Sequence, residues 1–213
     1  MRCLLLLSFV LISSSARAAT LTGHFTTGSG LTAEELKSDQ SWGQTFQIDP
    51  SGTIAEASID SVVLWLYRQQ DQNNKTITAS IRASWNGPAL WESTIAANGI
   101  EKDSSADQSA IHDAVNFVAV PATLLADTEY YLRVETTASE KVYIHYDQES
   151  SYSPGSLVNK DGVKEGSSKD LLFGIEGAYA VPEPSTVVLL GLCLVGWAPA
   201  RRALRGRPNA STN

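Results

Sequence analysis

Residues 76–85 alternate strictly between apolar and polar side chains, and this pattern limits the fold more than any other part of the chain. The apolar positions fall on one face of the segment and are Ile77, Ala79, Ile81, Ala83 and Trp85. A period of two over ten residues predicts a half-buried β-strand. The residues Asn86, Gly87 and Pro88 that follow are typical of a turn, so the segment is expected to end there.

The same pattern recurs along residues 19–180, which form one expected domain. Short segments rich in β-branched and aromatic residues are separated by polar turns, and the expected strands are 45–48, 58–67, 90–95, 117–120, 130–135, 142–147 and 171–175, together with 76–85. About eight such strands predict an all-β fold, a single antiparallel β-sandwich or jelly roll. Residues 33–37 form the one segment that resembles a helical turn, and no internal repeat is apparent.

The charge of this domain excludes one class of partner. The whole chain of 213 residues has a formal charge of -7, but residues 19–180 hold 10 Lys and Arg against 22 Asp and Glu, a balance of -12. Because nucleic-acid affinity depends on basic side chains that neutralise phosphates, we expect no nucleic acid as a partner. Neutral ligands, cations and basic partners remain open.

Residues 1–18 have the features of a secretory signal peptide. A short basic start is followed by about ten apolar residues and then by the small-x-small sequence Ala16-Arg17-Ala18, which predicts cleavage before Ala19. The apolar stretch is shorter than the roughly 20 residues that span a bilayer. Cys3 lies in this segment and Cys193 near the C-terminus, so the domain has neither a disulfide nor a cysteine-based nucleophile or zinc site.

The C-terminal segment changes composition abruptly. The sequence Val181-Pro182-Glu183-Pro184 opens it, an apolar stretch runs from 187 to 200, and the basic cluster Arg201, Arg202 and Arg205 comes next. Prolines break regular structure, and arginines keep a following tail on the cytoplasmic side of a membrane. Taken alone, this is a stop-transfer element of marginal length with an expected cytoplasmic tail at 206–213.

The order of these three parts in residues 181–205 resembles the PEP-CTERM sorting signal of Gram-negative bacteria. The resemblance implies a protein exported through the Sec machinery and held briefly in the inner membrane through residues 187–200. It also implies that an exosortase, a membrane protease, cuts near the Pro-Glu-Pro motif and passes the protein to the cell surface or the extracellular matrix. The apolar stretch is expected to be a helix.

A second resemblance covers most of residues 42–175. The sequences Trp-Gly-Gln-Thr-Phe at 42–46, Ile-Asp-Ser-Val at 59–62 and the stretch 121–134 are similar to the choice-of-anchor domains of bacterial surface proteins. That resemblance supports a β-sandwich and implies no activity.

No pattern of catalytic residues stands out, and we expect no enzyme. The histidines are His24, His112 and His145, and none belongs to a known metal or hydrolase motif. The acid pairs Glu34/Glu35 and Asp147/Glu149 have the residue types that flank a glycosidic bond, but an acidic solvated surface explains them as well.

Three loops hold oxygen ligands of the kind that calcium prefers. They are 71–74, 103–107 and 161–162, and none has the spacing of a calcium-binding loop. Asp and Asn favour such turns through local hydrogen bonds. No cofactor is therefore expected, with structural calcium as the alternative.

Aromatic side chains give the best indication of a ligand, since sugar rings stack on them. The alternation places Trp65 and Trp85 on core faces, whereas Trp91 beside Glu92 and Tyr143 opposite Val142 and Ile144 are expected to be exposed. Trp91 and Tyr143 are thus the candidate glycan contacts.

These features predict an exported, tag-sorted β-sandwich with a non-catalytic structural or glycan-associated role at the cell surface or in the extracellular matrix, where polysaccharide is the expected partner. An adhesin that resembles a carbohydrate-binding module is the main alternative. A polysaccharide hydrolase and an ice-binding protein are less favoured, the latter because Thr76, Thr78 and Ser80 form only one short polar row.

Overall fold

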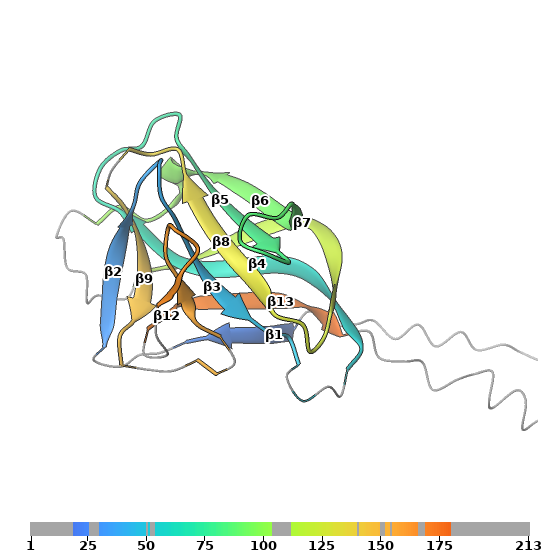
Figure 1. Cartoon of the computed structure of the whole chain (residues 1–213). Coiled ribbons are helices and arrows are strands. Elements are labelled where there is room, and N and C mark those ends of the chain that lie inside the picture. Colours follow the sequence, from blue (N-terminus) through green and yellow to red (C-terminus); the bar gives the residue numbers. More distant parts are fainter. Residues whose placement is uncertain are drawn as a thin grey trace, which may run out of the picture. The chain divides into compact units, whose positions relative to one another are not determined.

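The computed structural model is an all-β sandwich of two antiparallel sheets, which confirms the predicted fold class (Figure 1). The structure describes residues 19–25, 30–49, 51, 54–103, 112–139, 141–149, 152–153, 155–165 and 169–179. All of them belong to the first of two compact units, residues 1–180 and 181–213.

The larger sheet has seven strands in the order β1-β13-β4-β9-β12, with β7 beside β4 and β2 beside β9. Its strands are β1 (Ala19–His24), β2 (Leu31–Leu36), β4 (Glu56–Arg68), β7 (Ala114–Leu125), β9 (Val142–Asp147), β12 (Asp170–Leu171) and β13 (Phe173–Tyr179). The smaller sheet has six strands in the order β11-β10-β3-β8-β5-β6. They are β3 (Ser41–Phe46), β5 (Thr76–Arg82), β6 (Ala89–Ala96), β8 (Tyr130–Thr136), β10 (Leu157–Val158) and β11 (Lys164–Glu165), and the 3-10 turn η1 (Ala97–Gly99) follows β6.

Strand β4 organises the larger sheet because it has a different set of neighbours at each end. Residues 57–64 pair with β13 and residues 56–65 pair with β7, whereas Leu66–Arg68 pair with β9. Leu64 and Leu66 are fully buried between the sheets, and the intervening Trp65 points the other way and is half-buried. One face of β4 therefore packs in the core between the sheets, and the other lies on the outer side of the larger sheet.

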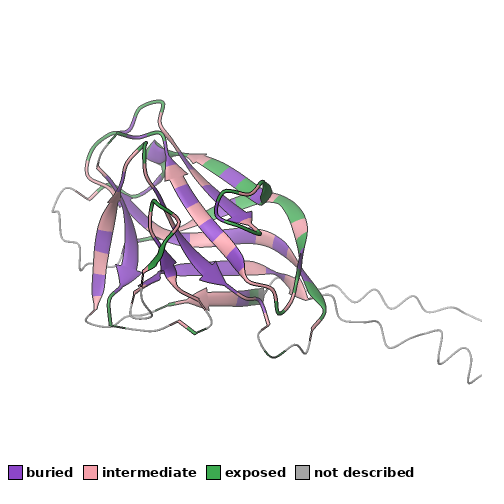
Figure 2. Ribbon diagram, viewed as in Figure 1, coloured by how far each residue is buried: buried purple, intermediate pink, exposed green. Residues whose placement is uncertain are grey.

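The core lies between the two sheets, and the strands that face it are the most buried parts of the ribbon (Figure 2). Phe46 of the smaller sheet packs against Phe173 of the larger one, with ring centroids 6.1 Å apart. Phe46 also lies 6.0 Å from the ring of Tyr130 on the neighbouring strand. Burial of such large apolar side chains is the main source of stability in a domain without disulfides.

Several predicted strands are confirmed, at 58–67, 90–95, 130–135 and 142–147, although their ends differ by a few residues. The expected helical turn at 33–37 is wrong, because residues 33–36 lie in β2 and pair in register with β9. Leu31, Ala33 and Leu36 are buried there. Tertiary pairing outweighs the weak helix propensity of this segment.

Other boundaries differ for local reasons. Strand β5 ends at Arg82, since Ser84 and Gly87 form a turn in which the Gly87 N–H donates to the Ser84 carbonyl at 2.9 Å. Ala83 is consequently exposed. The segment predicted at 171–175 is divided into β12 and β13 at Leu172, whose N–H donates to the carbonyl of His145.

The two shortest predicted strands are present with different bounds. The strand expected at 45–48 is β3, which starts earlier and ends at Phe46. The strand expected at 117–120 is the longer β7, in which the register against β4 shifts between the pairs Ile59–Ala122 and Ser61–Val118. Pro121 lies in this irregular stretch of an edge strand, where proline is tolerated.

The predicted signal peptide, sorting segment with its apolar helix and C-terminal tail fall outside the described residues. In the described part of the chain, no helical segment has the length and apolarity needed to cross a bilayer.

Candidate functional site

The predicted exposure of Trp91 and Tyr143 is wrong. Only 3% of Trp91 is exposed, because this residue belongs to the face of β6 that packs into the core. Tyr143 is 7% exposed, and its ring stacks on that of Tyr67 at 4.8 Å. Neither side chain presents an open ring face to a ligand.

Tyr67, on which Tyr143 stacks, is covered by the segment that joins β6 to β7. We call the described residues 100–103 and 112–113 of this segment the connector. His112 of the connector stacks on Tyr67, with ring centroids 4.0 Å apart and an angle of 13° between the rings. The outer face of β2, β4 and β9 carries a second small apolar cluster of Ala33, Tyr67 and Tyr143.

A polar row attaches the connector to the sheet. Nε2 of His112 lies 2.9 Å from the Asp103 carboxylate, and Nδ1 of His112 lies 2.8 Å from Nε2 of His145 on β9. Burial, together with the nearby charge of His112, lowers the pKa of His145 to about 4, against the opposite effect of a hydrogen bond with the backbone of Thr32. His112 and His145 are only 5% and 1% exposed, so this row is an internal contact with no open substrate side.

A second buried polar cluster joins the two sheets. The amide of Gln44 on β3 donates to Oδ1 of Asp170 at 2.7 Å and accepts from the N–H of Leu171 at 2.9 Å. Burial raises the pKa of Asp170, against the effect of its hydrogen-bond donors. His24 lies 3.7 Å from the carboxylate of Asp147, the residue paired with Asp170.

The two acid pairs noted in the sequence do not form a cleft with opposed carboxylates. Asp147 is 2% exposed and accepts a hydrogen bond from the backbone N–H of Glu149. Glu34 and Glu35 are consecutive in β2, so their side chains point to opposite faces of the sheet. Burial raises the pKa of Glu34, while Glu35 accepts from the N–H of Lys141 at 2.7 Å.

The loops considered for calcium use their carboxylates in ion pairs. Asp71 lies 2.7 Å from Arg68 and 3.1 Å from Lys102, and hydrogen bonds from Lys102 and Arg68 lower its pKa. Asp161 pairs with Lys160 at 3.0 Å. Among the described residues, no three His, Cys, Asp or Glu side chains are arranged to hold a metal ion; residues 104–107 are not described.

The polar row considered for ice binding is interrupted. Thr78 bonds across the strands to Thr94, with the hydroxyl oxygens 2.9 Å apart. Ser80, however, is fully buried and accepts from Nε of Arg82 at 3.0 Å.

An exposed aromatic pair lies on the outer face of the larger sheet. Phe25, directly after β1, is 53% exposed and meets Trp65 of β4 edge to face, with ring centroids 5.3 Å apart. The Phe25 ring rests on two glycines, since a Cβ at Gly174 would come within 2.9 Å of its Cζ and a Cβ at Gly23 within 2.9 Å of its Cε2. We call Phe25 and Trp65, with this glycine floor, the aromatic platform.

Sequence reasoning missed the platform. The core position expected for Trp65 is wrong, because its neighbours Leu64 and Leu66 are the residues that enter the core. Residues 62–67 are all apolar or aromatic, so the sequence pattern could not show which of the two faces enters the core. The pairing of Gly23 with Gly174, which makes room for Phe25, joins strands from opposite ends of the domain and leaves no local signal.

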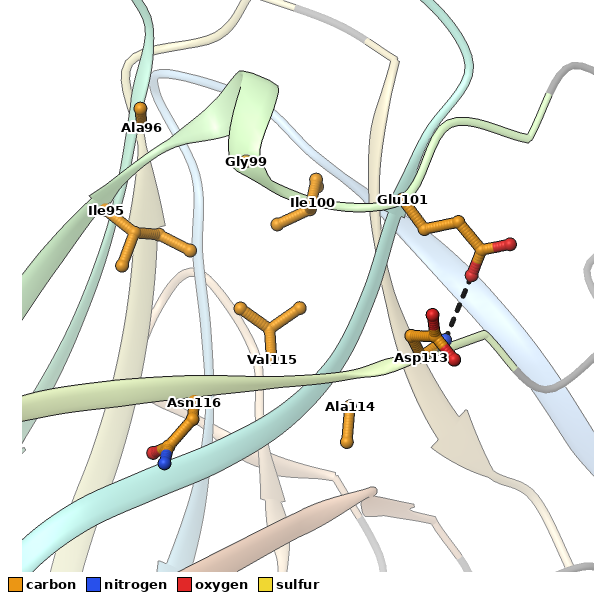
Figure 3. A pocket seen from close by; sticks show the side chains of 9 residues that line it. All are labelled: Ile95, Ala96, Gly99, Ile100, Glu101, Asp113, Ala114, Val115 and Asn116. Atoms are coloured by element: carbon orange, nitrogen blue, oxygen red, sulfur yellow. Dashed lines mark hydrogen bonds between the residues drawn. The ribbon is translucent and has the colours of Figure 1, made fainter.

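A pocket of about 640 Å³ opens between the end of β6 and the start of β7 (Figure 3). Ile95, Ile100 and Val115 provide its apolar lining. The carboxylates of Glu101 and Asp113 lie close together at one side, and Oε2 of Glu101 accepts from the N–H of Asp113 at 3.0 Å. The remaining lining residues are Ala96, Gly99, Ala114 and Asn116.

The comparisons with known proteins concern the end of the chain. Residues 180–202 match the PEP-CTERM protein-sorting motif, which confirms the predicted sorting signal to within a few residues. The motif identifies an exosortase substrate, exported and held in a membrane as a precursor before it is sorted to the surface. No curated protein matches the chain, and the similarity to choice-of-anchor domains stays a prediction.

Proposed function

We propose that the β-sandwich is a non-catalytic, glycan-associated component of the cell surface or extracellular matrix, and that it contacts polysaccharide through the aromatic platform. The observation that carries this proposal is the Phe25 ring, which is 53% exposed on a floor of two glycines beside Trp65. Single exposed apolar residues are ordinary on protein surfaces, but a supported pair of rings is a surface suited to stacking.

The chemistry of the platform suits sugars. A sugar ring presents apolar C–H groups on one face, and these pack against an aromatic ring while its hydroxyl groups stay hydrated or bond to polar neighbours. Asn116, which is exposed, is the cross-strand partner of Val63 beside the platform. The acidic charge of residues 19–180 does not oppose a neutral or a basic polymer.

The non-catalytic part of the proposal is supported by where the titratable groups lie. Asp103, His112 and His145 contact one another beneath the connector, and Asp170 is bound by Gln44. These contacts connect parts of the fold, and a site needs its own open geometry to support an activity.

The route to the surface follows from the sorting motif. We propose that the signal peptide directs the chain into the Sec pathway of a Gram-negative bacterium and that residues 187–200 hold it in the inner membrane. Exosortase then processes the chain near Pro182–Pro184 and releases it to the surface or matrix.

Affinity electrophoresis of the exported protein through gels of the host's extracellular polysaccharide tests the proposed ligand. We expect retardation of the wild-type protein and its loss in Phe25→Ala. Val163→Ala is the matched control, since Val163 is 58% exposed on a different hairpin, and it should leave mobility unchanged. Equal mobility of the wild type with and without polysaccharide would refute the glycan role, and release of reducing ends would make the protein a hydrolase.

A further inference from the structure

Strand β7 holds a row of exposed apolar side chains on the outer face of the larger sheet. Six large apolar side chains are exposed among the described residues, and three of them are Val118, Val120 and Leu125 of β7, with exposed fractions of 65%, 86% and 58%. The residue before each of them packs in or against the core. The three side chains therefore point outward.

The rest of the strand adds no charge to this row. Pro121, which follows Val120, is exposed as well, and β7 contains no Asp, Glu, Lys or Arg along its 12 residues. We call Val118, Val120, Pro121 and Leu125 the β7 surface. A continuous exposed apolar patch marks an interaction site more often than a single exposed residue does. Natural edge strands are commonly protected by charged side chains, so a bare one indicates a surface that is covered in use.

A partner would meet the side chains of this surface and not its backbone edge. The Ser93 hydroxyl of β6 donates to the carbonyl oxygen of Val118 at 2.8 Å, so the neighbouring sheet already occupies the backbone there. Pro121 has no N–H, and the register of β7 shifts beside it. An added strand needs a regular row of free backbone groups. Addition of a strand along the whole of β7 is therefore excluded.

Acidic side chains lie around the β7 surface. Glu56 is the cross-strand partner of Leu125, and Ser61, the partner of Val118, donates its hydroxyl to Glu176 on the next strand at 2.9 Å. Asp60 lies at the bulge of β4 between these two positions. None of the three acids forms an ion pair with a described residue.

Basic side chains are missing from the same part of the sheet. Strands β1, β7 and β13 contain no Lys or Arg, and Arg68 at the far end of β4 is bound to Asp71. The undescribed residues between 19 and 180 add none, since they include no Lys or Arg. On the smaller sheet, by contrast, Arg82 lies near both Glu92 and Glu135. The β7 surface is thus apolar with a rim of uncompensated negative charge.

We infer that the β7 surface docks a partner protein whose contact face has an apolar centre and a rim of Lys and Arg. Burial of the apolar centre supplies the attraction, and the basic rim neutralises Glu56, Asp60 and Glu176. A second copy of this chain would bring the same acids against one another, and like charges facing across an interface oppose association. The inference goes beyond the proposed glycan role and does not depend on it.

The test uses two synthetic amphipathic helical peptides of equal length with the same leucine face. One has Lys on its polar face and the other has Glu, and fluorescence anisotropy measures their binding to the exported protein. We expect the wild type to bind the Lys peptide, more weakly as salt rises, and not the Glu peptide. Equal affinity for the two peptides would overturn the assignment of a basic partner.

The apolar centre is tested by the double variant Val118→Ser with Leu125→Ser. Loss of two exposed apolar contacts should weaken binding of the Lys peptide about tenfold. The matched control is Leu90→Ser with Val163→Ser, because these residues are also exposed but lie outside the larger sheet. An equal loss in both variants, or none in either, would mean that the peptide binds the acidic domain without using the β7 surface.

The acidic rim is tested by Glu56→Gln. Removal of one exposed charge contact should weaken binding of the Lys peptide about threefold and reduce its dependence on salt. Asp39→Asn removes the same charge from an exposed turn between β2 and β3, and it should bind as the wild type does. Equal effects of the two changes would show that only the total charge matters, against a specific rim.

Two further measurements separate this inference from its alternatives. Sedimentation velocity should show that the exported protein is a monomer; a dimer that dissociates in Val118→Ser with Leu125→Ser would assign the surface to a second copy and overturn the inference. Retardation by polysaccharide should be the same in this variant and in the wild type. Loss of retardation would make the β7 surface part of the glycan site, whereas failure of the glycan role itself would leave the peptide results unchanged.

Discussion

Nδ1 of His112 lies 2.8 Å from Nε2 of His145, although the two histidines come from separate segments of the chain. One of these nitrogens must donate a proton and the other accept it, so both rings cannot hold a proton on the facing atoms. His112 is also bonded to Asp103 through its second nitrogen. The position of the connector on the sheet thus depends on the protonation state of His145.

The first prediction is that acid weakens the fold through His145. Its pKa in the folded protein, about 4, is below the ordinary value of 6.5. Between these two pH values, His145 is protonated in the unfolded chain and neutral in the folded chain. Stability is therefore full above pH 6.5 and falls as the pH drops towards 4. We expect the free energy of unfolding to decrease by about 2 kcal/mol at pH 5 from this group.

Urea unfolding at a series of pH values measures this effect. His145→Gln should lower stability at neutral pH but show a smaller dependence on pH in this window than the wild type. Parallel curves for the two proteins would contradict the assignment to His145.

The second prediction concerns the amide that links the sheets. Gln44→Leu removes the donor to Asp170 and the acceptor for the Leu171 N–H, both buried. Because unsatisfied buried polar groups are costly, we expect a loss of about 2 to 4 kcal/mol in the free energy of unfolding. Gln148→Leu is the control, since Gln148 is exposed and its side-chain amide donates to the Tyr146 hydroxyl at 3.1 Å. Similar losses in the two variants would show that the link contributes little.

The third prediction separates the platform from the stability of the sheet. A Cβ at Gly174 would meet the far atoms of the Phe25 ring, and the next nearest atom is Cβ of Val63 at 3.7 Å. Gly174→Ala should therefore displace Phe25 and reduce retardation by polysaccharide, with little change in thermal stability. At Gly23 the added atom would lie 2.6 Å from the Phe173 carbonyl oxygen, so Gly23→Ala should lower stability by about 1 to 3 kcal/mol. Unchanged retardation in Gly174→Ala would mean that the ring position is unimportant for binding.

The fourth prediction tests the sorting motif. Intact mass of the protein recovered from the cell surface should show a chain that has lost Leu204, since processing near Pro182–Pro184 removes everything beyond. Replacing Pro182 and Pro184 by alanine should leave the precursor at full mass in the membrane fraction. Pro208→Ala, outside the matched residues 180–202, should be processed normally. A surface protein that still contains Leu204 would count against the motif's role.

Alternation along the sequence was enough to predict the fold class and the main strands. Ile77, Ala79 and Ile81 are fully buried as expected, because the period of side chains in a strand is independent of its partners. The sorting motif could also be predicted from the sequence alone, since its recognition depends on the order of residues and not on the fold.

The candidate site could not be predicted in the same way. His145 of β9 is buried because His112 of the connector lies against it, and Tyr143 of the same strand is buried against Tyr67. Both side chains therefore lie inside where alternation alone places them outside. The platform depends on β1 lying beside β13, which brings Gly23 to Gly174. Such contacts are decided by topology and not by any local pattern.

The pairing of β1 with β13 also determines how this domain would carry a load. Ala19 is paired with Gly177 and His24 with Phe173, so Phe25 lies at the opposite end of the ladder from Tyr179, after which the sorting motif follows. A pull between a polymer held at Phe25 and an attachment beyond Tyr179 would run along these two strands. The hydrogen bonds between the two strands are perpendicular to the direction of the pull. The strands would therefore be loaded in shear, and all of these bonds would have to break together. The domain would then hold a strained polymer more firmly than a fold whose strands are peeled apart one bond at a time.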